Sequence, residues 1–122
     1  ILPINFNHLI NRLKNKIGAM TLVKNINYKN NNTLSNLDLK NGSVKIAPKK
    51  KFMNGGIYFF NKRILKYIRG KKHSLENDLL KDLINKRKIN GIAENQFFLD
   101  IGTPKNLRGA PKLLKKTFLH YK

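Results

Sequence analysis

The sequence contains no cysteine and no tryptophan, and only six of its 122 residues are acidic. Without cysteine there is no disulfide framework and no thiolate metal site, and the redox compartment is left open. No apolar run approaches the roughly 20 residues that cross a bilayer, and the first residues lack the basic start and long apolar stretch of a signal peptide. These absences predict a soluble chain that has no membrane partner and is cytoplasmic.

Basic residues dominate the charge of the chain. Its 26 Lys and Arg residues give a formal net charge of +20. Such a chain binds polyanions through phosphate contacts and counterion release, so a basic nucleic-acid-binding module is one alternative function. The lysines run from Lys14 to Lys122, however, and the densest cluster, Lys49 to Lys51, lacks the interleaved aromatic residues of single-strand binders. This spread of charge argues against a specific nucleic-acid partner.

Local signals in the first half of the chain predict a helix, a strand and a hairpin. A length of 122 residues with 40% hydrophobic residues allows one modest core. Asn5 or Asn7 is expected to cap a short amphipathic helix over residues 7–14, and residues 19–23 are expected to form a strand. The asparagine-rich segment 28–33 predicts a loop. Asn41-Gly42 predicts the type I′ turn of a β-hairpin.

The second half predicts further strands that alternate with helices. The apolar run 56–60 indicates a central strand covered on both faces. Helices are expected over 61–69, stopped by a glycine, and over 75–86, capped by Ser74. Short strands follow at 89–93 and 97–100. A last helix is expected to begin at Thr103 and Pro104, with Pro111 interrupting or kinking it. The alternation predicts an α/β layered sheet.

Three stretches, in this order, resemble the sugar-1-phosphate nucleotidyltransferases: MNGGIYFF at 53–60, SLENDLL at 74–80 and FFLDIGTP at 97–104. The likeness covers most of the chain and is strongest to the branch that acts on heptose- or hexose-1-phosphates with GTP or a related nucleotide. It implies the C-terminal part of a Rossmann-like mixed-sheet fold, with residues 1–122 forming a partial domain that carries the sugar-binding half. The family's nucleotide loop and first metal-binding Asp precede the matched region, so the 122 residues alone are expected to be inactive.

The resemblance implies a reaction between two phosphorylated substrates. A sugar-1-phosphate oxygen attacks the α-phosphate of a nucleoside triphosphate, pyrophosphate leaves, and a nucleotide sugar is formed. Such chemistry depends on positioning and on charge neutralisation, for which the family uses Mg²⁺. By resemblance, Asp100 is one of two carboxylates that hold Mg²⁺, a cation that prefers oxygen ligands. The alternative role for Asp100 is a cap of the helix that begins near Thr103.

The resemblance also implies residues that bind the sugar. Glu76, in the first turn of its helix, matches a glutamate that accepts hydrogen bonds from sugar hydroxyls; the alternative is an acid that only stabilises the helix. Asn54, Gly55 and Gly56 resemble an Asn-Ala-Gly segment whose small residues let the backbone approach the sugar. Gly55 departs from the commoner Ala. The alternative for the glycines is a bulge at the strand entry.

One departure from the family lies just before this strand. The family commonly places a Glu-Lys pair there, with the Lys meeting the sugar phosphate, whereas residues 47–51 read APKKK and contain no Glu. Lys49 or Lys50 could take that role, but a solvated lysine run is the better interpretation. The missing pair also leaves open a non-catalytic regulatory relative.

The remaining titratable residues are not assigned to catalysis. Asp78 and Asp82, one helical turn apart, are interpreted as an exposed face paired with lysines rather than as a metal pair. The three histidines, His8, His73 and His120, are isolated from acids in the sequence, and none is expected to be a catalytic base.

Overall fold

The structure is a computed structural model that describes residues 5–24, 34–49, 51–68, 70, 74–94, 101–102 and 104–118. The chain forms two compact units. One unit spans Asn5–Asn95, and the other comprises Ile1–Ile4 and Gln96–Lys122. The second unit contains helix α3 (Pro104–Phe118), which continues through Pro111, so the expected interruption of this helix does not occur.

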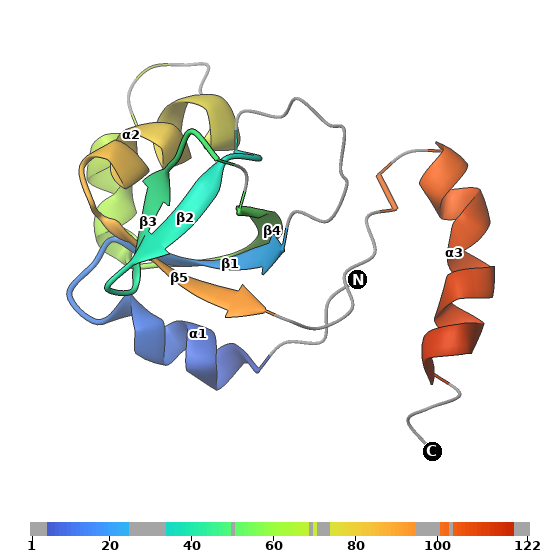
Figure 1. The fold of residues 1–122 in the computed structure, drawn as a ribbon. Coiled ribbons are helices and arrows are strands. Elements are labelled where there is room, and N and C mark those ends of the chain that lie inside the picture. Colours follow the sequence, from blue (N-terminus) through green and yellow to red (C-terminus); the bar gives the residue numbers. More distant parts are fainter. Residues whose placement is uncertain are drawn as a thin grey trace. The chain divides into compact units, whose positions relative to one another are not determined.

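The Asn5–Asn95 unit carries the strands and the other helices (Figure 1). In chain order they are α1 (Phe6–Leu13), β1 (Gly18–Lys24), β2 (Leu37–Lys40), β3 (Ser43–Ile46), β4 (Phe52–Phe60), the 3₁₀ helix η1 (Lys62–Tyr67), the π-helical turn η2 (Leu75–Leu80), α2 (Lys81–Asn85) and β5 (Ile89–Glu94). Among the described residues, no helix is both long enough and apolar enough to span a membrane.

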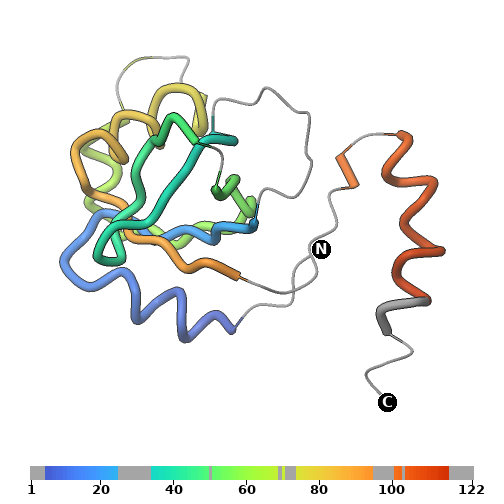
Figure 2. The backbone as a smooth tube through the Cα atoms, in the orientation of Figure 1, coloured from blue at the N-terminus to red at the C-terminus, as the bar shows by residue number. Residues whose placement is uncertain are grey.

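The five strands close into a small barrel in the order β1-β4-β2-β3-β5. β1 pairs along its length with β4, which is antiparallel, and with β5, which is parallel. Figure 2 shows β5 beside β1 although the two are far apart in the sequence. Single residue pairs, Leu37 with Phe52 and Ser43 with Asn90, join the β2–β3 hairpin to the rest. The α/β class and the hairpin are confirmed, but the hairpin closes a barrel, so a Rossmann-like open sheet is not observed.

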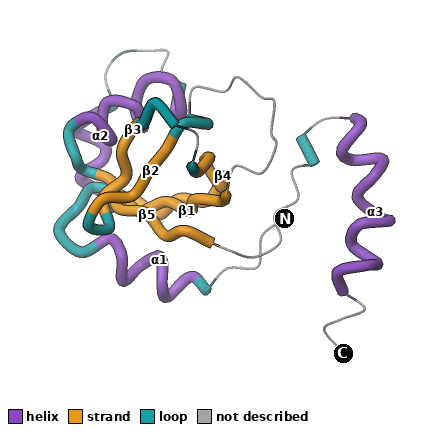
Figure 3. Tube along the Cα trace, in the orientation of Figure 1, coloured by secondary structure: helices purple, strands orange, loops and turns teal. Residues whose placement is uncertain are grey.

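Helical segments lie on both sides of the strands (Figure 3). The core contains apolar side chains from β1, the hairpin, β5 and the η2–α2 segment. The η2–α2 segment contributes the residues that its periodicity predicts, namely Leu79, Leu80, Leu83 and Ile84. Leu75, at the end of that stripe, is instead 41% exposed. On the other side, α1 buries Leu9 completely.

Three local signals predict their elements correctly. The Asn5 side chain accepts a hydrogen bond from the backbone N–H of Asn7 at 3.0 Å and caps α1. The Ser74 hydroxyl accepts from the N–H of Asn77 at 3.1 Å and caps η2. Asn41 and Gly42 have φ angles of +52° and +78°, as a type I′ turn requires. In each case the side chain or backbone freedom of one residue determines the local geometry.

Two predictions about coverage are wrong. β4 is not covered on both faces, since Phe59 remains 37% exposed; most of β4 pairs with β1 alone and reaches β2 only at Phe52. The helix expected over 61–69 is the shorter η1, and Leu65 on it is 69% exposed. The loop at 28–33, the strand at 97–100 and the cap at Thr103 lie outside the described residues.

Gly91 tests whether the barrel closes as described. A Cβ atom on Gly91 would lie 2.7 Å from Leu39 Cδ2, 2.8 Å from Val44 Cγ2 and 3.0 Å from Leu22 Cδ1, atoms of three other strands. We expect Gly91→Ala to lower the free energy of unfolding by about 1–3 kcal/mol through overpacking. Urea denaturation measures it. Gly109→Ala, in α3 where a Cβ meets no atom within 4 Å, should be neutral or stabilising; equal effects of both substitutions would contradict the closure.

Candidate functional site

A hydrogen-bonded cluster joins β4 to η2. The side-chain amide of Asn54 donates to Glu76 Oε1 at 2.9 Å, and the Tyr58 hydroxyl donates to the same oxygen at 3.2 Å. Asn54 Nδ2 also hydrogen-bonds the Tyr58 hydroxyl oxygen. Asn54, Tyr58 and Glu76 are all half-buried. We refer to these three residues as the Asn54–Tyr58–Glu76 cluster.

The local structure of η2 positions Glu76. Ser74 and Asp78 cap each other, since Asp78 Oδ2 accepts from the Ser74 N–H at 2.8 Å, and the Ser74 carbonyl accepts from the N–H of Asp78 at 3.2 Å. Leu79 and Leu80 anchor the turn in the core. An isolated π-helical turn is a feature often found at functional sites. The cap and the buried leucines together hold Glu76 toward β4.

A bulge in β4 positions Asn54 and Tyr58. Their partners on β1 are Leu22 and Met20, so three residues of β4 lie opposite one residue of β1, Thr21. The Gly56 N–H donates to Asn54 Oδ1 at 3.0 Å, and Gly56 has a φ of +75°, which glycine adopts without strain. The interpretation of the glycines as a bulge is therefore confirmed, and the bulge lies within the segment that contributes to the cluster.

The structure explains why Gly55 is not alanine. Gly55 is buried against Thr21, and a Cβ atom at position 55 would overlap the Thr21 hydroxyl and lie 3.1 Å from the Thr21 carbonyl oxygen. Thr21 is itself fully buried, and its hydroxyl donates to the Ile57 carbonyl at 3.4 Å. The small residue at position 55 is thus required by its neighbour on β1.

Tyr58 was not singled out by the sequence. Burial raises the pKa of the Tyr58 hydroxyl to about 12. The Asn54 hydrogen bond opposes this shift, and the charge and hydrogen bond of Glu76 add to it. The Tyr58 ring stacks on Phe60 with centroids 5.8 Å apart. The available signal was a tyrosine within an apolar strand, because a partly buried hydroxyl usually has a hydrogen-bond partner.

The arrangement is suited to accepting hydrogen bonds. Within the described residues, both hydrogen-bond partners of Glu76 contact Oε1. A carboxylate held by an amide and a protonated hydroxyl accepts strongly from neutral donors such as alcohol groups. The cluster can therefore orient a polyhydroxylated ligand.

Two other acids of the described chain, Asp38 and Asp82, pair with lysines. Lys51 donates to Asp38 at 2.9 Å and lowers the pKa of that carboxyl, with help from the Leu39 N–H. Asp82 pairs with Lys86 at 2.8 Å across one helical turn, as expected of an exposed face. Lys49 is exposed, as in a solvated lysine run, and Lys50 lies outside the described residues.

The predicted metal ligand cannot be placed. Asp100 lies outside the described residues, as do His73 and His120. Within the part of the chain that is described, no three His, Cys, Asp or Glu side chains gather where they could hold a metal ion. Of the predicted site residues, the structure brings Asn54 and Glu76 into direct contact and places Gly55 and Gly56 in the adjoining bulge.

Gly55→Ala should disturb the bulge through Thr21. We expect a loss of about 1–3 kcal/mol in the free energy of unfolding, because the new methyl group meets buried atoms. Adding Thr21→Ala removes the overlapping hydroxyl and should recover part of that loss. A double-mutant cycle in urea measures the coupling, and strictly additive effects would contradict the packing of Gly55 against Thr21.

Tyr58 should ionise later than an ordinary tyrosine. Since its pKa is about 12 in the folded chain against an ordinary 10.0, its contribution to stability is complete below pH 10 and is lost as the pH rises toward 12. A tyrosinate absorbance titration should show a late step that Tyr58→Phe removes and that Glu76→Gln moves to lower pH. A titration of Tyr58→Phe that keeps this late step would refute the assignment.

No family model matches the chain. The chain is 33% identical over 88 residues to the bifunctional protein GlmU of Methanocaldococcus jannaschii, a match that covers 64% of this chain and 22% of that protein. The chain thus spans about a fifth of the length of the curated relative that it matches. This similarity supports the motif-based resemblance to sugar-1-phosphate nucleotidyltransferases at the level of the broad family, and it does not distinguish a branch.

Proposed function

We propose that this chain is the sugar-binding part of a nucleotidyltransferase that transfers a nucleoside monophosphate from a nucleoside triphosphate to a heptose- or hexose-1-phosphate. The observation that carries the proposal is the 2.9 Å hydrogen bond between Asn54 and Glu76. The resemblance assigns these two residues to sugar binding from separate motifs, 22 positions apart. Their direct contact supports one shared site.

In this proposal Glu76 binds the sugar through its hydroxyl groups. Asn54 and Tyr58 fix Oε1, so the carboxylate plane is set before the ligand arrives, and Oε2 accepts from a sugar hydroxyl. Preorganisation of this kind lowers the entropic cost of placing the sugar. Gly56, where an added Cβ would meet no atom within 4 Å, lets backbone groups of the bulge approach the ring.

Mg²⁺ and Asp100 belong to the proposal through the resemblance alone. The ion would neutralise charge on the phosphate oxygens. The described acids do not form a metal site of their own. Asp100 is proposed as one of its ligands, and an aspartate from residues that precede position 1 in the family is proposed as the other.

Activity should depend separately on Glu76 and Asp100. The assay measures Mg²⁺-dependent pyrophosphate release from a panel of sugar-1-phosphates and nucleoside triphosphates, with the chain extended by the upstream residues of its gene. Glu76→Gln should raise KM for the sugar-1-phosphate roughly 10- to 150-fold, as expected for about 1.5–3 kcal/mol from a charged hydrogen bond. Asp100→Ala should lower kcat at least a hundredfold.

Asp82→Asn is the matched control for these substitutions. It removes a carboxylate of the described chain that pairs with Lys86 on an exposed face, so activity should be unchanged. Release of pyrophosphate that survives Asp100→Ala would remove the metal assignment. A KM for the sugar-1-phosphate that is insensitive to Glu76→Gln would remove the sugar site.

A further inference from the structure

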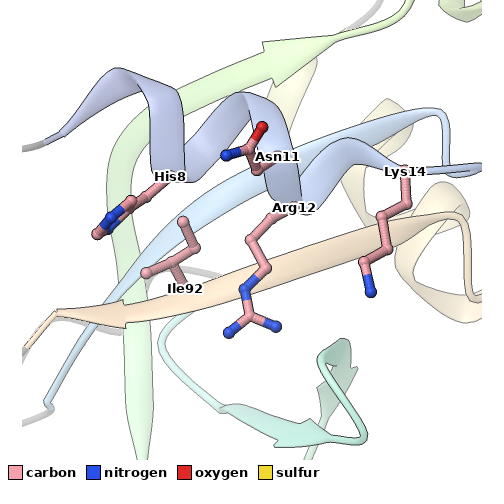
Figure 4. Close-up of a pocket in the computed structure, with 5 residues that line it drawn as sticks. All are labelled: His8, Asn11, Arg12, Lys14 and Ile92. Carbon is pink, nitrogen blue, oxygen red and sulfur yellow. The ribbon is translucent and has the colours of Figure 1, made fainter.

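A groove of about 410 Å³ lies between α1 and β5 (Figure 4). Its lining residues are His8, Asn11, Arg12 and Lys14 from α1 and the residue that follows it, and Ile92 from β5. The volume falls within the range of sites for small molecules. Figure 4 shows the side chains of His8, Arg12 and Lys14 extending from α1 alongside β5, with Ile92 between His8 and Arg12.

The backbone around the groove is fixed by hydrogen bonds. Asn90, only 9% exposed, donates from its side chain to the Arg12 carbonyl at 2.8 Å and so attaches the last turn of α1 to β5. Just beyond the helix, Ile17 donates its N–H to the Lys88 carbonyl at 2.9 Å. Leu9 anchors the middle of α1 in the interior. The cations therefore extend from a rigid support.

Among the residues that the structure describes, the two permanent cations of the groove have no acidic partner. Within the described residues, the side-chain ion pairs are Lys51 with Asp38 and Lys86 with Asp82, and neither involves Arg12 or Lys14. Arg12 reaches toward the hairpin turn, where Nη1 lies 3.6 Å from the position of a Cβ on Gly42. Glu94 shares the Ile92 side of β5, two residues on, but does not line the groove. A mobile anion is the natural partner of these groups.

Lys14 has a strained backbone. Its φ of +43° and ψ of −125° lie in a region that side-chain-bearing residues rarely occupy. Such strain costs of the order of 1–3 kcal/mol and is found preferentially at binding and catalytic sites. Lys14 is the second residue of the turn Leu13–Lys16, in which the Lys16 N–H donates to the Leu13 carbonyl at 2.8 Å, and a glycine would adopt this conformation more easily.

The other lining residues define the rest of the ligand. Ile92 provides an apolar floor, and the flat ring of His8 lies beside it. An aromatic base packs well against such surfaces, and Asn11 offers amide groups for its polar edge. Arg12 and Lys14 suit phosphate oxygens, Arg12 through its paired N–H groups.

We infer that this groove binds a small phosphorylated ligand of the nucleotide class, with the phosphate between Arg12 and Lys14 and the base over Ile92 and His8. The inference does not rest on the proposed nucleotidyltransferase activity. α1 and the η2–α2 segment lie on different sides of the strands (Figure 1), so the groove is separate from the Asn54–Tyr58–Glu76 cluster.

The test is a calorimetric titration of the 122-residue chain with AMP, GMP, adenosine, inorganic phosphate and a single-stranded oligonucleotide at two salt concentrations. A nucleoside monophosphate should bind saturably and more tightly than either adenosine or phosphate. Arg12→Gln and Lys14→Gln should each weaken it at least tenfold. Lys66→Gln, an exposed cation on η1, should leave binding unchanged, because it alters the net charge equally without touching the groove.

Lys14→Gly separates binding from folding. It should weaken the nucleotide at least tenfold while raising the urea midpoint, since glycine relieves the strained φ. Equal weakening by Lys66→Gln, or binding only to a single-stranded oligonucleotide, would overturn the inference in favour of general polyanion attraction. If inorganic phosphate bound as tightly as the nucleoside monophosphate, the assignment of the ligand to the nucleotide class would be wrong. If Lys14→Gly bound the nucleoside monophosphate normally, the proposed role of Lys14 would be wrong.

Discussion

The packing of β1 against the bulge of β4 is the constraint on which the candidate sugar site depends. Thr21 is completely buried opposite Gly55, Gly56 and Ile57, and its hydroxyl donates to the Ile57 carbonyl. These three residues of β4, opposite a single residue of β1, form the bulge. Within it, the Asn54 side chain accepts a hydrogen bond from the Gly56 N–H. Asn54 and Tyr58 then meet Glu76. A substitution of Thr21 would therefore alter the surroundings of the Glu76 carboxylate, although Thr21 is not in contact with it.

Local chemistry made several parts of the fold predictable from the sequence. Asn5, Ser74 and the Asn41-Gly42 pair act on atoms within a few residues of themselves, so their effects can be read from short stretches. Glu76 and the Asn54 segment were identified by motif. Their contact joins two separate elements, and the sequence carried no local signal for it. The resemblance supplied the residues, and the fold brought them together.

Features that depend on pairing between distant segments were not predictable. The exposure of Phe59 follows from β4 having β1 as its partner along most of its length, and closure of the barrel rests on single pairs at Phe52 and Ser43. In the sequence, Tyr58 is part of the apolar stretch MNGGIYFF, and nothing there identifies a partner for its hydroxyl. The structure shows that the hydroxyl donates a hydrogen bond to Glu76. Periodicity measures burial along one element and cannot report such partners.

Each positive φ angle of a described residue other than glycine belongs to a turn or a helix end. Three residues other than glycine have positive φ angles, among those described: Lys14, Asn41 and Arg87. Asn41 belongs to the type I′ turn. Arg87 ends α2 in a Schellman motif, in which the N–H of Lys88 bonds to the Leu83 carbonyl and the N–H of Arg87 to that of Ile84.

Lys14 is the second residue of the β-turn Leu13–Lys16, which is closed by a 2.8 Å hydrogen bond from the Lys16 N–H to the Leu13 carbonyl. Its φ of +43° and ψ of −125° are close to those of a type II′ turn, which favours glycine at this position. Its ammonium group extends beside Arg12 over the groove, where the described residues place no carboxylate. A bound phosphate would offset the cost of the strained backbone in the complex. In the free chain the strain persists, which is why a glycine at this position should stabilise the fold and weaken the ligand at the same time.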